Sequence, residues 1–246
     1  MKKPFLMLLL VLLPVFWVNP TNAQSDDLKV AKEAVQQSYD KLVEVQDEQG
    51  LNQALTVALT EVVQFTITET ENLIQRLLAI KGQPLEILKL QESYLKELEK
   101  FLIYQKEFLI KITPQADIQQ LASDFKDWRE KVYDPEVKKI VSFILVFRGS
   151  DLLAVAASRF NKIASDLKLF QNSKLIKVDV LMPVLEQAGF SLRGAAKINQ
   201  EAVRSLLATS TDPLETNKLV DQVIGLIKSA YGKFLEMSSL VKKMIN

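Results

Sequence analysis

A seven-residue repeat of apolar pairs between Pro84 and Ile112 constrains the fold of this chain more than any other feature. Such spacing predicts one amphipathic helix with a wide apolar stripe, which is stable only where other helices cover it. We expect Leu95→Asp, in the middle of the stripe, to be among the most damaging single changes, because it would bury an unpaired charge. The repeated pairs are Ile87/Leu88, Tyr94/Leu95, Phe101/Leu102 and Phe108/Leu109.

Apolar residues at three- and four-residue spacing predict helices along most of the chain. The segment VVQFTITET within 51–80 is rich in β-branched residues, yet the apolar positions around it keep a helical period. Thr113-Pro114, Asp134-Pro135 and Asp212-Pro213 each pair a capping residue with a first-turn proline, and Gly149-Ser150 indicates a helix end. The expected helices are 26–48, 51–80, 84–112, 113–134, 135–149, 151–171, 178–209 and 213–245.

The fold class that these helices predict is all-α. Short loops make consecutive helices antiparallel neighbours, so we expect an elongated antiparallel bundle of about seven long helices, with a kink or break near Pro135. Residues 24–246 would form a single all-helical domain or two sub-bundles, 24–112 and 113–246.

The N-terminal residues are typical of a secretory signal peptide. Lys2 and Lys3 precede an apolar run from Phe5 to Val18, and the run is shorter than the roughly 20 residues of a membrane-spanning helix. The small residues Thr21 and Ala23 predict cleavage between Ala23 and Gln24. The protein would then be exported to the periplasm or the medium, and retention of the segment as an anchor is the alternative.

Charge and composition exclude several classes of function. The sequence has 31 basic and 30 acidic residues, so no excess of positive charge predicts binding to nucleic acid. It has no cysteine, so an exported form could not be stabilised by disulfides. It has no histidine either. The absence of both residue types excludes histidine-based triads, cysteine nucleophiles and ordinary zinc sites.

The remaining residue types show no pattern typical of an enzyme, so we expect neither catalysis nor a cofactor. Asp124, Asp127 and Glu130 are spaced three residues apart, as carboxylates at a metal site could be. Basic residues alternate with them, which favours a solvated charged helix face. We therefore expect no bound metal.

One segment is apolar enough to suggest contact with a membrane or a partner. Residues 140–147 are apolar around most of the helix circumference, and a second apolar run follows Arg148-Gly149-Ser150-Asp151. The two runs could form an apolar hairpin inside the bundle or one that inserts into lipid. The candidate contact residues are Ile140, Phe143, Ile144 and Phe147.

Three functions agree with these features. The first is an exported, non-enzymatic scaffold or interaction module of a bacterial envelope or secreted fraction, which binds a protein partner or itself through helix faces. The second is a membrane-associating or pore-forming protein that inserts through residues 140–157. The third is a bundle that binds a small ligand between its helices, in the manner of a sensor.

Overall fold

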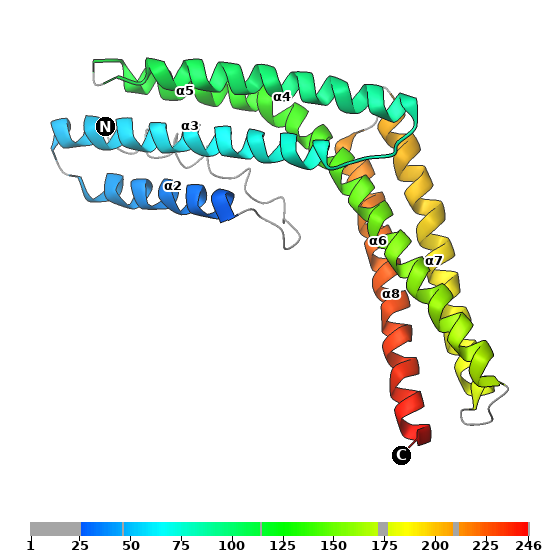
Figure 1. Cartoon of the computed structure of the whole chain (residues 1–246). Coiled ribbons are helices and arrows are strands. Elements are labelled where there is room, and N and C mark those ends of the chain that lie inside the picture. The colour runs from blue at the N-terminus through cyan, green and yellow to red at the C-terminus, as the bar shows by residue number, and fades with distance from the viewer. Residues whose placement is uncertain (1–25, 46, 114, 172–176, 209–211, 246) are drawn as a thin grey trace. The chain divides into compact units, whose positions relative to one another are not determined.

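The protein is helical throughout the part of the chain that the structure, a computed structural model, describes. That part comprises residues 26–45, 47–113, 115–171, 177–208 and 212–245. The all-α prediction is confirmed. The elements are α2 (Asp26–Glu44), α3 (Glu48–Leu78), α4 (Leu85–Lys111), α5 (Ile118–Trp128), the π-helical segment η2 (Arg129–Tyr133), α6 (Asp134–Gln171), α7 (Val178–Leu207) and α8 (Pro213–Ile245) (Figure 1).

The chain divides into two compact units after Ile140. Unit 1 holds α2 to α5, η2 and the first residues of α6, and unit 2 holds the rest of α6 with α7 and α8. The boundary therefore differs from the sub-bundle boundary predicted at 112/113. The predicted signal segment, with Thr21, Ala23 and Gln24, lies outside the described residues.

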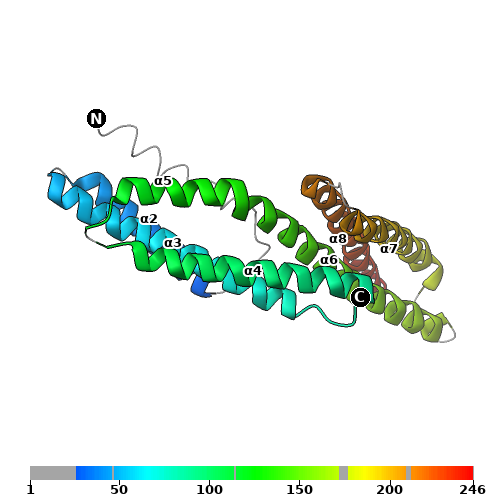
Figure 2. The same ribbon diagram turned by 90° about the horizontal axis from the view of Figure 1, so that it is seen from above.

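In unit 1, α3 lies beside both α2 and α4, and apolar residues of α2, α3 and α5 share one core with Phe108 of α4 (Figure 2). Aspartates cap two of these helices: Asp47 accepts from the amide of Gly50 at 2.6 Å at the start of α3, and Asp117 accepts from the amide of Gln120 at 3.1 Å at the start of α5. The predicted start at Thr113-Pro114 is therefore wrong. The short loop after α3 contains Gly82, whose φ of 70° suits glycine.

The heptad stripe of α4 is buried along the first member of each apolar pair. Ile87, Tyr94, Phe101 and Phe108 are buried, as is Leu98, whereas the second members, including Leu95, are only half-buried. Thus the centre of the stripe lies one residue away from the predicted position. Gln91 and Gln105 also lie on the buried face, and Gln105 is 0% exposed.

The β-branched segment in the middle of α3 is helical, as its apolar period predicted. Thr66 and Thr70 are buried there, and each hydroxyl donates to the carbonyl oxygen four residues earlier at 2.8 Å. These bonds satisfy the polar groups within the helix itself. Helical packing outweighs the local strand preference of the sequence.

The sequence predicted two interruptions in this region, at Pro135 and at Gly149. At Pro135 the helix is irregular as predicted, because the π-helical segment η2 ends at Tyr133 and α6 begins at Asp134. Gly149 and Ser150 are helical, and the Ser150 hydroxyl donates to the carbonyl oxygen of Val146 at 3.1 Å. The predicted helix end at Gly149 and the apolar hairpin that depended on it are therefore wrong.

Unit 2 is built on the closely packed antiparallel pair α7 and α8, with α6 beside it. Small residues allow this close approach: Ala188 and Ala195 are buried, and a Cβ atom added at Gly194 would lie 3.3 Å from Leu226 of α8. Asp212 caps α8 by accepting from the amide of Leu214 at 3.0 Å, as predicted. Apolar side chains of α6, α7 and α8 form the core of the unit.

Candidate functional site

The segment predicted to contact a membrane or a partner is inside the protein. Ile140, Phe143, Ile144 and Phe147 are at most 4% exposed. The stretch Ile118–Gln171 is the one run among the described residues that is long and apolar enough to cross a membrane, by length and composition only, and 44% of its most apolar window is buried. The structure therefore exposes no apolar surface at these four residues.

An open apolar cavity lies between the three helices of unit 2, and we call it the α6/α8 groove because these two helices supply most of its lining. Its volume is about 730 Å³, within the range of roughly 300–1,000 Å³ that is typical of small-molecule sites. Eight apolar side chains line it: Ile163, Leu167, Phe170, Leu181, Phe234, Met237, Val241 and Met244.

The groove has a buried floor and a more exposed rim. On its floor, Leu167, Leu181 and Met237 are at most 5% exposed although they line the cavity. Side chains nearer the mouth are half-buried or exposed, and Phe170 is 40% exposed. A buried apolar floor with polar groups only at the rim suits an apolar ligand group that leaves water there.

The polar side chains of the groove are three exposed residues on its two main walls. Asp166 belongs to α6, and Ser238 and Lys242 belong to α8, one helical turn apart. Asp166 and Lys242 make no ion pair with each other or with any other residue that the structure describes. The mouth thus presents opposite charges on opposite walls.

A smaller cavity of about 470 Å³ lies between α6 and α7. Small side chains form much of it, and a Cβ atom added at Gly189 would lie 3.1 Å from the Phe160 ring. The Arg193 guanidinium at its edge stacks over the Phe190 ring at 4.6 Å. This cavity is smaller than the α6/α8 groove and has fewer large apolar side chains in its lining.

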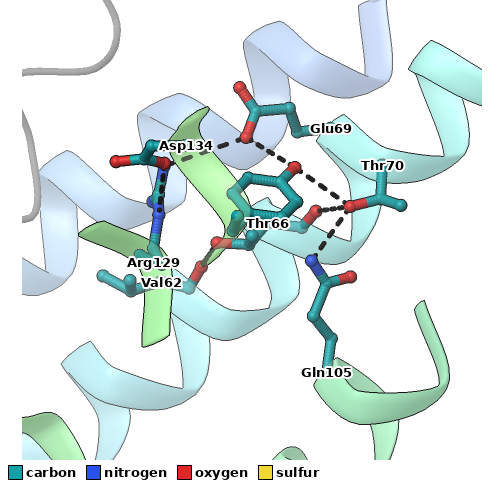
Figure 3. Close-up of polar contacts among 8 residues, drawn as sticks. Val62, Thr66, Glu69, Thr70, Gln105, Arg129 and Asp134 are labelled. Atoms are coloured by element: carbon teal, nitrogen blue, oxygen red, sulfur yellow. Dashed lines mark hydrogen bonds and ion pairs between the residues drawn. The ribbon is translucent and has the colours of Figure 1, made fainter. Parts of the chain in front are cut away.

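A network of buried polar side chains connects α3, α4 and η2 in unit 1 (Figure 3). The Tyr133 hydroxyl lies 3.0 Å from the Thr70 hydroxyl and donates to Oε2 of Glu69 at 3.0 Å. The Gln105 amide donates to the Thr70 hydroxyl at 2.9 Å. Hydrogen bonds therefore join α4 to α3 at Thr70 and η2 to α3 at Glu69.

The π-helical turn brings a cation into this network. Residues five apart share a face in a π-helix, so Arg129 lies beside Asp134, with Nη2 3.3 Å from Oδ1. The same nitrogen lies 3.9 Å from Oε2 of Glu69, and the guanidinium stacks over the Tyr133 ring at 5.5 Å. Nη1 of Arg129 has no hydrogen-bond partner among the described residues.

Burial shifts the titration of the acidic groups in the network. It raises the pKa of Glu69 and of Asp134, and the Arg129 guanidinium partly opposes both shifts. Burial, together with the Glu69 carboxylate, raises the pKa of Tyr133 well above its usual value. The network therefore places the Arg129 guanidinium beside two carboxyl groups, those of Glu69 and Asp134, whose pKa values are raised.

Most of this network is closed to a solute, and only the Glu69 side chain, at 21%, is partly exposed. Arg129 is 2% exposed and Gln105 is 0% exposed, so helices would have to separate before a ligand reached either side chain. The sequence did give a signal for Gln105 and Gln91, because both stand at stripe positions of α4. It gave none for Arg129 or Glu69.

Asp124, Asp127 and Glu130 form no metal site. Within the described ranges, no group of three His, Cys, Asp or Glu side chains could hold a metal ion. Asp127 pairs with Lys131, and Glu130 lies 3.8 Å from Lys126, as on a solvated face. Comparisons of the chain with protein-family models, with curated proteins and with solved structures find no match.

Proposed function

We propose that this is an exported, non-enzymatic binding protein that takes the apolar chain of a small molecule into the α6/α8 groove. The observation that carries the proposal is the groove itself, with a volume of about 730 Å³, a buried apolar floor and polar residues at its mouth. An apolar pocket with few polar groups is the usual form of a small-molecule site. Each methylene group that leaves water there would contribute about 0.8 kcal/mol.

The sequence supports the other parts of the proposal. The N-terminal pattern favours export, and the absence of histidine and cysteine removes the commonest catalytic side chains. The volume of the groove, about 730 Å³, and its few polar side chains are typical of a small-molecule site, and they favour a small molecule over a partner helix. The burial of Ile144 and its neighbours does not favour insertion through residues 140–157.

Displacement of a neutral fluorescent probe tests the proposal. N-phenyl-1-naphthylamine should bind the purified protein with enhanced emission, and compounds with a single alkyl chain should displace it. Val241→Trp places a large side chain in the groove and should abolish binding, whereas Leu235→Trp, on an exposed residue of the same helix, should not. Circular dichroism confirms that both variants fold. Equal binding by the two variants contradicts the proposal.

A further inference from the structure

The walls of the α6/α8 groove differ in charge, and this difference selects among molecules that carry an apolar chain. Lys242 and Ser238 stand on the α8 wall, where an ammonium group and a hydroxyl can both donate to one anionic oxygen cluster. Asp166 stands on the α6 wall and can attract a cation. Because neither charge is paired within the described part of the chain, both are available to a ligand.

From this arrangement we infer that the groove binds a single-chain amphiphile with a zwitterionic head, of the phosphocholine or phosphoethanolamine type. The inference rests on the proposed function and adds the class of ligand. The alkyl chain lies along the floor beside Leu181 and Met237. The phosphate accepts from Lys242 and Ser238, and the ammonium group faces Asp166.

The length of the groove suits one chain of moderate size. Its lining on α8 extends from Phe234 to Met244, which is about 15 Å at 1.5 Å per residue. A purely anionic amphiphile would leave Asp166 close to its head, and a purely cationic one would lie beside Lys242.

The test compares four dodecyl compounds that differ only in the head group: dodecylphosphocholine, dodecyl sulfate, dodecyltrimethylammonium and dodecyl maltoside. Each displaces N-phenyl-1-naphthylamine from the purified protein at concentrations below its micelle threshold. Because the chain is constant, differences in affinity report on the head group alone. We expect the zwitterion to bind about two- to fivefold more tightly than each of the others, as exposed charge pairs contribute modestly.

Substitutions at the mouth of the groove then test which protein charge contacts which part of the head group. Lys242→Gln should remove the preference for the zwitterion over dodecyltrimethylammonium, and Asp166→Asn should remove its preference over dodecyl sulfate. Lys243→Gln and Asp151→Asn are the matched controls, since they remove exposed charges on the same two helices that do not line the groove. Both controls should keep the wild-type order of affinities.

The outcomes separate this inference from the proposed function. If all four compounds bind equally, or if Lys242→Gln and Asp166→Asn behave like their controls, the zwitterion assignment is wrong while the groove remains a binding site. If none of the compounds binds, or if Val241→Trp does not weaken their binding, both proposals fail. Thermal unfolding of each variant shows whether a lost affinity reflects a lost fold.

Discussion

The Tyr133 hydroxyl donates to Oε2 of Glu69 across 3.0 Å, although the two residues are 64 positions apart in the chain. Tyr133 is 0% exposed and belongs to η2, and the Glu69 side chain is 21% exposed and belongs to α3. This bond joins the π-helical turn to the helix opposite it. The stability of unit 1 should therefore respond to both residues.

Tyr133→Phe should destabilise the protein by about 1–3 kcal/mol. The change removes the donor to Glu69 and the contact with the Thr70 hydroxyl, and it leaves buried polar groups without their partner. Urea unfolding followed by circular dichroism measures the difference. Tyr39→Phe in α2 is the control, and a loss of the same size there would mean that the network is not the cause.

Glu69→Gln should change how stability depends on pH. The folded-state pKa of Glu69 is raised, so its contribution is fully present below the unfolded-state pKa and is lost as pH rises through the folded-state pKa. Glutamine does not titrate and its amide oxygen still accepts from Tyr133. We expect the variant to gain stability relative to the wild type between acidic and neutral pH, as measured by urea unfolding across that range. A constant difference at every pH would contradict the raised pKa.

Arg129→Met should destabilise the protein by about 3–5 kcal/mol at neutral pH, because it leaves the Asp134 carboxylate and the partly exposed Glu69 carboxylate without their cation. Adding Asp134→Leu should recover part of the loss, since it removes one of those carboxylates. Thermal unfolding of the single and double variants gives the comparison. Lys131→Met, which breaks an exposed pair in the same turn, should change little. A double variant no more stable than the single one would contradict the pairing.

Leu98→Ala should cost about 2–5 kcal/mol, because Leu98 is 0% exposed at the centre of the α4 stripe. Leu95→Ala should cost less, since Leu95 is half-buried. For the same reason, Leu98→Asp should be more damaging than Leu95→Asp. The urea midpoints of the four variants rank the two positions. A larger loss of stability at Leu95 than at Leu98 would contradict the burial seen in the structure and support the stripe centre that the heptad pattern predicted.

Gly189→Ala and Gly225→Ala should have opposite effects. An added Cβ at Gly189 meets the Phe160 ring at 3.1 Å, and overpacking of this kind costs about 1–3 kcal/mol. Nothing lies within 4 Å of a Cβ added at Gly225, so alanine there should stabilise α8 by about 0.5–1 kcal/mol. Melting temperatures of the two variants test the packing of α6 against α7, and a stabilising Gly189→Ala would contradict it.

Prediction from sequence succeeded where local periodicity decides the structure. The all-α class, the helical state of VVQFTITET and the cap at Asp212 all depend on residues within a few turns of one another. It failed at Gly149, because a glycine ends a helix only when the surrounding packing does not continue it, and α6 is held on both sides of that residue. It also placed the centre of the α4 stripe one residue from its true position. Both members of each apolar pair recur every seven residues, so the spacing alone does not show which member is buried.

The candidate site depended almost entirely on tertiary structure. The apolar residues of the groove belong to the helical apolar patterns of α6 and α8. Those patterns do not show whether the space between the helices is filled by side chains or left as a cavity. Lys242 and Asp166 are 76 positions apart in the chain and line the same cavity only in the folded structure. Sequence alone gave no reason to prefer them over other exposed charges.

Helical periodicity and helix caps act over short distances, so the residue pattern alone is enough to specify a set of long amphipathic helices. Which faces of those helices are covered and which remain open depends on how the helices pack together. The five-residue spacing of Arg129 and Asp134 shows the reason. In an α-helix these residues would point in different directions, and the π turn that aligns them forms where packing around Tyr133 and Glu69 stabilises it.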